Sequence, residues 1–259
     1  FMDIVEYNRR AWNQQSRDNG PWSSPVSKST IEAAQDGNWG VVLTPHKLVP
    51  KSWFGQLKGK KVLCLAAAGG QQAPTLAAAG ADVVSFDLSE VQLEKDQMVA
   101  HRHQLDLVCL RGDMADLSQL PAVSFDLIFH PVSNLFVPDV EIVWRQCFRV
   151  LKPQGDLLAG FMNPSIFLFD HDKSERTGKI EVERKLPYAE PDDLNQAGRL
   201  DLELSGRALE FSHSLDTQLG GQLRAGFVIT DLYEDDWDEL QPLNTYSPSS
   251  IATRARKLG

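Results

Sequence analysis

Residues with the chemistry to hold a small ligand recur just after the apolar runs of this chain. The stretch VLCLAAAGGQQAP, residues 62–74, joins an apolar run to a helical pattern through a loop of small residues. In an open parallel sheet such a loop approaches the ligand closely, and the helix that follows it offers unpaired backbone N–H groups. Asp87 ends the next apolar run and Asp113 follows the third. The pattern therefore predicts a small-residue loop and two carboxylates at one edge of a sheet.

The spacing of the small residues in this loop favours one class of ligand. The dinucleotide fingerprint G-x-G-x-x-G, counted from Ala66, has its third glycine at the position that Gln71 occupies. Ala66, Ala68 and Gly70 are instead spaced two residues apart, which suits an amino-acid tail with a sulfonium better than a pyrophosphate. A nicotinamide-dependent oxidoreductase is therefore the weaker alternative.

The elements that must position these residues alternate along the chain. Apolar runs without strict alternation are typical of strands covered on both faces, and amphipathic segments separate them. This order predicts an α/β, doubly wound, Rossmann-like sheet that is mostly parallel. The strands are expected at residues 61–66, 82–87, 105–110, 125–130, 155–161, 227–232 and 250–256.

Three helices have clear sequence signals. Ser89 with Gln92 forms a capping box, which predicts a helix that ends near residue 103. The apolar stripe of residues 139–151 predicts a second helix, ended by a turn at residues 152–155. A third helix is expected at residues 214–226, where three leucines are spaced four residues apart.

Several motifs, in this order, resemble the class I S-adenosylmethionine-dependent methyltransferases. The loop spacing, VVSFDLS, GDMADL, SFDLIFHPVSN and CFRVLKPQGDLLAGF match that family's pattern over residues 60–162. GGQQ and GGQLRAGFVITDLYED resemble, more narrowly, a bacterial branch whose substrate is unassigned. The resemblance implies seven strands with the last one antiparallel, S-adenosyl-L-methionine as the cofactor, and direct displacement of its sulfonium methyl by an acceptor. A non-catalytic S-adenosylmethionine-binding protein is an alternative.

The resemblance also implies which residues bind the donor. Asp87 matches the acid that accepts from both ribose hydroxyls, and Asp113 with the N–H of Met114 matches the segment that flanks the adenine. Asp87 and Asp113 have an alternative role as helix caps, Asp113 for a short helix over residues 114–120. The implied set is Ala66, Ala68, Gly69, Gly70, Gln72, Asp87, Leu88, Gly112, Asp113, Met114 and His130.

The donor loop departs from the family pattern at three positions. Ala66 and Ala68 replace glycines, which requires that both keep a negative φ. Cys64 replaces a frequent acid, and the amide of Gln71 or Gln72 is expected to supply a contact in exchange.

Catalytic and acceptor-binding candidates lie at the ends of later elements. His130 ends the fourth strand and is the first candidate for a general base, with His213 the second. The alternative is that His130 is a histidine satisfied by the backbone at the end of a strand. Trp12, Asn134 and Asn163 are predicted to bind the acceptor, although Asn134 has an alternative role in holding its turn and Trp12 an alternative place in the core.

The remainder of the chain predicts a cover over the site. Residues 1–59 are expected to form an N-terminal helical cap or lid, and residues 60–259 the methyltransferase domain. Within that domain, residues 163–207 lack a convincing strand and predict an insert that covers the substrate.

Composition limits the partners of the chain. A net charge of −9 and the absence of a Lys/Arg block disfavour nucleic acid, which leaves a small, partly apolar methyl acceptor. No apolar run is long enough to span a membrane, and no residue pattern predicts a metal site. Three cysteines in apolar stretches suggest reduced thiols and a cytoplasmic protein. The sequence predicts neither the oligomeric state nor whether O, N, S or C is methylated.

Overall fold

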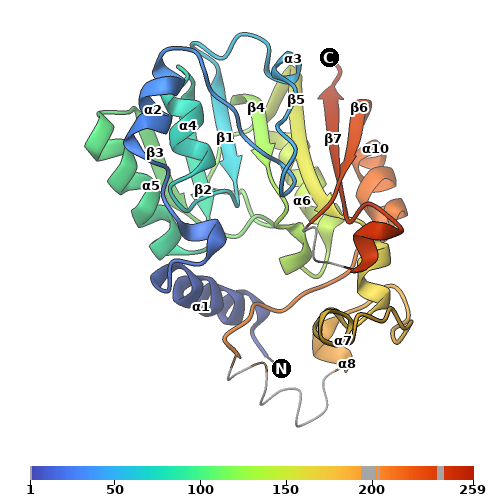
Figure 1. Ribbon diagram of the computed structural model, residues 1–259. Coiled ribbons are helices and arrows are strands. Elements are labelled where there is room, and N and C mark those ends of the chain that lie inside the picture. The colour runs from blue at the N-terminus through green and yellow to red at the C-terminus, as the bar shows by residue number, and fades with distance from the viewer. Residues whose placement is uncertain (1, 194–201, 203–204, 238–241) are drawn as a thin grey trace.

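A seven-stranded sheet with the order β3-β2-β1-β4-β5-β7-β6 forms the centre of the protein (Figure 1). The computed structural model describes residues 2–193, 202, 205–237 and 242–259. β7 runs antiparallel to both of its neighbours, and the pairs from β3 to β5 are parallel, which confirms the predicted α/β fold. The strands are β1 (Lys61–Leu65), β2 (Asp82–Asp87), β3 (Leu107–Arg111), β4 (Phe125–His130), β5 (Leu151–Met162), β6 (Phe227–Asp235) and β7 (Ser250–Lys257).

Helices cover both faces of this sheet, so the central strands are buried on both sides. On one face Val62 and Cys64 pack against α4 and the N-terminal segment, and on the other Leu63 and Leu65 pack against α6. The α-helices are α1 (Ile4–Arg17), α2 (Lys28–Gln35), α3 (Lys51–Phe54), α4 (Gln72–Ala78), α5 (Glu90–His103), α6 (Val140–Val150), α7 (His171–Thr177), α8 (Glu190–Asp193) and α10 (Gly221–Ala225). Shorter helical turns are η1 (Pro21–Ser23), η2 (Asn134–Phe136), η3 (Pro164–Leu168), the π-helical η4 (Asp216–Gly220) and η5 (Pro242–Thr245).

The N-terminal helix α1 is fixed to the start of α5. The Ser89 hydroxyl donates to Asn13 Oδ1 at 2.7 Å, and Asn13 Nδ2 donates to Glu90 Oε1 at 2.8 Å. Ser89 Oγ also accepts the N–H of Gln92 at 3.1 Å, so it caps α5 as predicted. The Gln92 side chain does not return to Ser89 and contacts Trp22 instead.

Two local predictions are wrong. Residues 152–155 do not separate a helix from a strand, because β5 already begins at residue 151 and the register shift in its pairing with β4 spans them. Residues 114–120 form turns and no helix. Pro153 and Gly155 favour a turn locally, and the sequence does not show that these residues are part of β5.

The leucines of the helix predicted at residues 214–226 do not form its buried side. Leu215 and Leu223 are 45% and 54% exposed. The buried side consists of Gln218, which pairs with Asn134, Gly221, whose Cβ would lie 2.8 Å from Trp144 Cδ1, and Gln222, which accepts from Thr253. Tertiary hydrogen bonds and a close helix contact therefore override the leucine pattern.

Candidate active site

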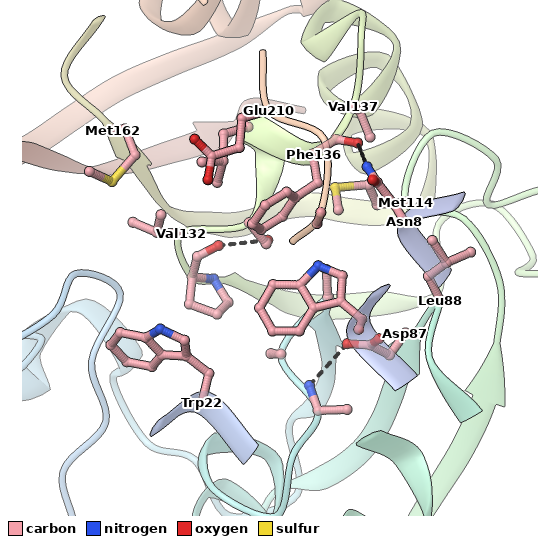
Figure 2. Close-up of a pocket in the computed structure, with 18 of the residues that line it drawn as sticks. Asn8, Trp22, Asp87, Leu88, Met114, Val132, Phe136, Val137, Met162 and Glu210 are labelled. Atoms are coloured by element: carbon pink, nitrogen blue, oxygen red, sulfur yellow. Dashed lines mark hydrogen bonds between the residues drawn. The ribbon is translucent and has the colours of Figure 1, made fainter. Parts of the chain in front are cut away.

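A cavity of about 570 Å³ opens at the carboxyl ends of the parallel strands. Loops after β1, β2, β3 and β4 line it together with α1, the segment 42–45 and the start of the insert. Figure 2 shows Asp87 and Leu88 at one end of this cavity and Met162 and Glu210 at the other. Its size is that of ordinary small-molecule sites, and its position is where doubly wound sheets bind ligands.

The Asp87 carboxylate joins the loops after β1 and β2. Its Oδ2 accepts the N–H of Ala68 at 3.2 Å, and its Oδ1 accepts the N–H of Ser89 at 2.9 Å (Figure 2). Burial raises the pKa of Asp87 to about 6, although these backbone hydrogen bonds act in the opposite direction. The carboxylate is therefore mostly ionised at pH 7.

Ala66 adopts a left-handed backbone, which corrects the expectation of a negative φ. Its φ is +49°, and its N–H donates to Phe86 O at 2.8 Å. That bond extends the β1–β2 pairing into the loop and holds the chain in a conformation that costs a non-glycine residue about 1–2 kcal/mol. Ala68 has no such strain.

Gly69 and Gly70 do not line the cavity. Both have a positive φ, and a Cβ at Gly69 would lie 2.4 Å from the carbonyl oxygen of Trp22. A Cβ at Gly70 would lie 2.8 Å from Cβ of Pro25. The glycine pair therefore allows the N-terminal segment to pack onto the donor loop, which explains these glycines without a ligand contact.

A buried acid on α5 holds the same loop from below. Asp96 accepts the N–H of Gly70 at 2.6 Å and the hydroxyl of Ser85 at 2.7 Å. Burial raises the pKa of Asp96 to about 7. Sequence analysis missed this residue, because an acid in a helix is usually a solvated one.

Gly112, Asp113 and Met114 line the cavity beside Asp87 and Leu88. Oδ1 of Asp113 accepts the N–H of Ala115 at 2.9 Å, so it fixes a turn and leaves its second oxygen for a ligand. A Cβ at Gly112 would lie 2.2 Å from Cζ of Phe86. The glycine thus lets the loop after β3 approach β2 closely.

His130 and His213 are both buried and do not line the cavity. His130 Nδ1 donates to Leu65 O at 2.9 Å, and its ring meets Trp144 edge-on at 6.0 Å. Burial lowers the pKa of His130 to about 4. His213 Nε2 donates to Asn134 O at 3.1 Å, and burial lowers its pKa as well. These positions favour a structural role for both histidines over that of general bases, although the buried Nε2 of His130 has no hydrogen-bond partner among the described residues.

Of the three residues predicted to bind the acceptor, one lines the cavity and two do not. Trp12 lines the cavity and meets Phe136 edge-on at 5.1 Å. Asn134 is fully buried in an amide pair with Gln218, with bonds of 3.0 and 3.2 Å. Asn163 caps η3 through Ser165 and donates to Pro248 O at 3.1 Å. Only Trp12 of the three therefore lines the cavity.

Cys64 is fully buried in β1 and does not reach the cavity. The two expected replacement amides are bound to the N-terminal segment. Gln71 Nε2 donates to the carbonyl oxygens of residues 21 and 24, and Gln72 Oε1 accepts the N–H of Val42 at 3.2 Å. Both glutamines still line the cavity.

Comparisons with known proteins agree with this geometry. A family model described as a methyltransferase domain matches residues 63–159. The chain is 46% identical over 257 residues to the Bacillus subtilis (strain 168) protein named "Uncharacterized methyltransferase YbaJ", which covers 98% of this chain and 99% of that protein.

The chain belongs to the S-adenosylmethionine-dependent methyltransferases.

Solved methyltransferase structures share the fold of the chain. An S-adenosylmethionine-dependent methyltransferase from Mesorhizobium loti superposes with a TM-score of 0.62 at 20% identity, over 80% of this chain and 95% of that one. The 1,6-didemethyltoxoflavin-N1-methyltransferase of Burkholderia thailandensis, solved with S-adenosylhomocysteine, gives a TM-score of 0.60 at 13% identity, over 100% of this chain and 92% of that one. S-Adenosyl-L-methionine is the cofactor of the methyltransferase family to which the chain belongs.

The residues at the Asp87 end of the cavity fit such a donor. A carboxylate has about four lone-pair sites, and the backbone hydrogen bonds to Asp87 do not use all of them. The remaining acceptor capacity suits the hydroxyl groups of a ribose. Gln92 also lines the cavity, and its buried Oε1 has no hydrogen-bond partner within the described part of the chain, so this end still has an acceptor for a polar ligand.

Sequence analysis missed most of the opposite end of the methyltransferase cavity. These residues come from distant segments and carry no shared motif, so spacing along the chain gave no signal for them. The missed lining residues include Ile4, Asn8, Gln15, Trp22, Thr44, Val132, Phe136, Met162, Ile166, His171, Arg207, Glu210, Trp237 and Ser249.

Among the described segments, no helix is long and apolar enough to cross a membrane.

Proposed function

We propose that this methyltransferase transfers the methyl group of S-adenosylmethionine directly to a small, partly apolar acceptor. The observation that carries the proposal is the continuity of the cavity. It runs from Asp87, at the end of β2, to Met162, at the end of β5, and to Trp237 and Ser249 near β6 and β7. A donor whose ribose lies on Asp87 therefore leaves the second end for an acceptor.

The proposed chemistry relies on positioning. The sulfonium supplies an activated methyl group, which the acceptor's nucleophile takes as the carbon–sulfur bond breaks and S-adenosylhomocysteine is released. Asp87 would hold the ribose, and Asp113 with the N–H of Met114 would hold the adenine. Because His130 and His213 do not line the cavity, the proposal gives them no part in proton transfer. Alignment of two reactants lowers a barrier by roughly 7–11 kcal/mol in well-oriented systems.

The character of the second end supports a small acceptor. Phe136, Val132 and Met162 contribute apolar side chains at this end (Figure 2). Trp12 and Trp237 also line the cavity. The net charge of −9 gives no support to a polyanionic acceptor.

We also propose that residues 1–59 and 163–207 act as covers of this site. Ile4 and Trp12 of α1 line the cavity, as do Ile166, His171 and Arg207 from the insert. Residues 194–201 and 203–204 of the predicted insert lie outside the described residues.

The acceptor class is tested by incubating the purified protein with methyl-labelled donor and a bacterial extract. We expect label in the low-molecular-weight, moderately apolar fraction, and none from an Asp87→Ala variant. Label confined to RNA or protein would contradict the proposed acceptor class while leaving the methyltransferase assignment intact.

A further inference from the structure

A carboxylate lies at the end of the cavity that the donor would leave open. Glu210 is partly buried and lines the cavity, and Figure 2 shows it at the end opposite Asp87. Its carboxylate is directed toward the part of the cavity that Met162 and Val132 line (Figure 2). The proposed donor uses Asp87 and Asp113 for its ribose and adenine, so it does not account for a further carboxylate at the far end.

The backbone around Glu210 is fixed by hydrogen bonds to two other segments. The Leu209 N–H donates to Asn8 Oδ1 at 2.7 Å, and the Leu209 carbonyl oxygen accepts from Asn8 Nδ2 at 3.2 Å. The Glu210 N–H donates to Glu190 Oε2 at 3.1 Å, and the Glu210 carbonyl oxygen accepts the N–H of Glu190 at 3.0 Å. An ordered backbone therefore carries the Glu210 side chain. Such pre-organisation reduces the entropy that is lost when a ligand binds.

The charged groups around the cavity favour a cation at this end. Four of the described lining residues are acidic, and they outnumber the two basic ones, Arg207 and His171. Arg207 pairs with a carboxylate outside the cavity, because its Nη2 lies 3.2 Å from Glu190 Oε1. The four acidic residues are Asp87, Asp113, Asp139 and Glu210. Since a carboxylate attracts a cationic ligand group and repels an anionic one, this lining disfavours an anionic acceptor.

Aromatic rings in the same cavity suit the same kind of ligand. The rings of Trp12 and Phe136 meet edge-on at 5.1 Å, and those of Trp22 and Trp237 meet at 5.7 Å. All four side chains line the cavity. The face of an aromatic ring attracts an ammonium group within about 6 Å and also packs on apolar carbon. A carboxylate together with these rings favours an amine on an apolar body over a phosphate or a carboxylate.

We propose that the methyl acceptor carries an amine on an apolar body and that the Glu210 carboxylate binds this amine in its ammonium form. The inference rests on the proposed function, in which the donor's ribose lies on Asp87 and the acceptor occupies the Met162 end. Glu210 is then a specificity-determining residue that acts in acceptor binding.

The first test measures the charge of the labelled product. The purified protein is incubated with methyl-labelled donor and a bacterial extract, and the low-molecular-weight products, freed of unused donor, are passed over a cation exchanger at pH 7. We expect the exchanger to retain the label. With diluted extract, Glu210→Gln should lower labelling about 10- to 100-fold, the usual effect of one hydrogen bond to a charged group. Glu234→Gln, the same substitution at an exposed position of β6 outside the cavity, should not lower it.

The second test uses probes of known charge. On protein saturated with S-adenosylhomocysteine, 2-phenylethylamine should bind at least about tenfold more tightly than 3-phenylpropionate in isothermal titration, because the two probes share the phenyl ring and differ in the sign of their charge. Glu210→Gln should remove this preference. Glu210→Asp, which keeps the charge, should retain it.

The outcomes separate this inference from the proposed function. Label that the exchanger does not retain, no preference for the amine in the unsubstituted protein, or a preference that persists in Glu210→Gln would overturn the role of Glu210. An unsubstituted protein that does not bind S-adenosylhomocysteine would instead overturn the proposed donor site. Affinity of Glu210→Gln for S-adenosylhomocysteine should change less than about twofold, since the two sites are distinct, and this measurement shows that the variant is folded.

Discussion

The two ends of the cavity are built in different ways. The Asp87 end is made from the loops that directly follow β1, β2 and β3, and backbone hydrogen bonds to Asp87 and Asp96 fix it. The Met162 end is made from the loop after β4, the end of β5, and side chains of α1, the segment 42–45, the insert and the residues around Trp237 and Ser249. The first end thus depends mainly on the sheet, and the second depends also on segments outside it.

This difference separates what the family shares from what one member binds. The sheet-borne end fits a donor that every member of the family uses, whereas the added segments can change without disturbing the sheet. The glycine pair at residues 69 and 70 connects the two, because it allows residues 22–25 to pack onto the donor loop. We therefore expect donor binding and acceptor choice to respond to different substitutions.

The largest difference between the two ends is expected from a pair of substitutions, one at each end. Asp87→Ala removes both carboxylate oxygens, which we propose accept the ribose hydroxyls, and two hydrogen bonds to a charged group are together worth at least about 3 kcal/mol. We expect titration to show S-adenosylhomocysteine affinity falling more than about 100-fold. Met162→Ala should change it less than about twofold, although it widens the cavity. Asp82→Ala, at the exposed start of the same strand, is the control.

His130 tests whether a buried residue between the two ends serves chemistry or packing. His130→Ala removes a ring that packs on Trp144 and leaves Leu65 O without its donor. We expect a loss of about 2–4 kcal/mol in the free energy of unfolding, measured with denaturant, and unchanged donor affinity. His101→Ala, at an exposed position, should be neutral. A stable His130→Ala protein that binds donor but has lost its methyl transfer would return His130 to the role of base.

The pH dependence of donor binding tests the charge at the Asp87 end. The pKa of Asp87 is raised to about 6, so the carboxylate is ionised above that pH and protonated below it. Because the ionised form accepts the ribose hydrogens better, donor affinity should fall about tenfold between pH 7 and pH 5. Titrations across this range should show the fall in the unsubstituted protein and a smaller fall in Asp87→Asn, in which Asp96, with its pKa raised to about 7, still titrates. A flat profile in both would mean that Asp87 does not carry the charge that matters.

A smaller effect on stability is expected from substitutions of two alanines in the donor loop. Ala66→Gly should stabilise the protein by up to ~1 kcal/mol, because glycine tolerates the φ of +49°. Ala68→Gly should instead destabilise it by about 0.5–1 kcal/mol. Residue 68 does not have a positive φ, so glycine relieves no strain there and only increases the conformational entropy of the unfolded chain. Thermal unfolding of the two variants checks the contrast, and a shift of the same sign in both would refute it.

The sequence predicted the sheet and the Asp87 end because both depend on local signals. The strands at residues 82–87 and 125–130 have the predicted bounds, since short apolar runs between turns leave little freedom. Asp87 ends β2 and Met114 lies shortly after β3, so both line the cavity at the carboxyl edge of the sheet. The family resemblance then supplied the ligand, which spacing alone did not identify.

The failures of the prediction occur where distant segments compete with a local pattern. Leu223 is exposed although it fits a helical stripe, because Gln218 and Gln222 bond to distant residues on the inner side. Gly69 matches a ligand loop but contacts Trp22. His130 ends its strand as predicted, yet its ring turns to a backbone carbonyl. No spacing along one sequence reveals such partners, which is why the acceptor end of the cavity was largely missed.

The most direct test of the two-ended cavity is a crystal structure of the protein with S-adenosylhomocysteine. The account predicts both ribose hydroxyls within about 2.6–3.0 Å of the Asp87 carboxylate, adenine beside Asp113 and Met114, and open space remaining between Met162, Trp237 and Ser249. A nucleoside lying against Met162 and Glu210, with no contact to Asp87, would contradict it.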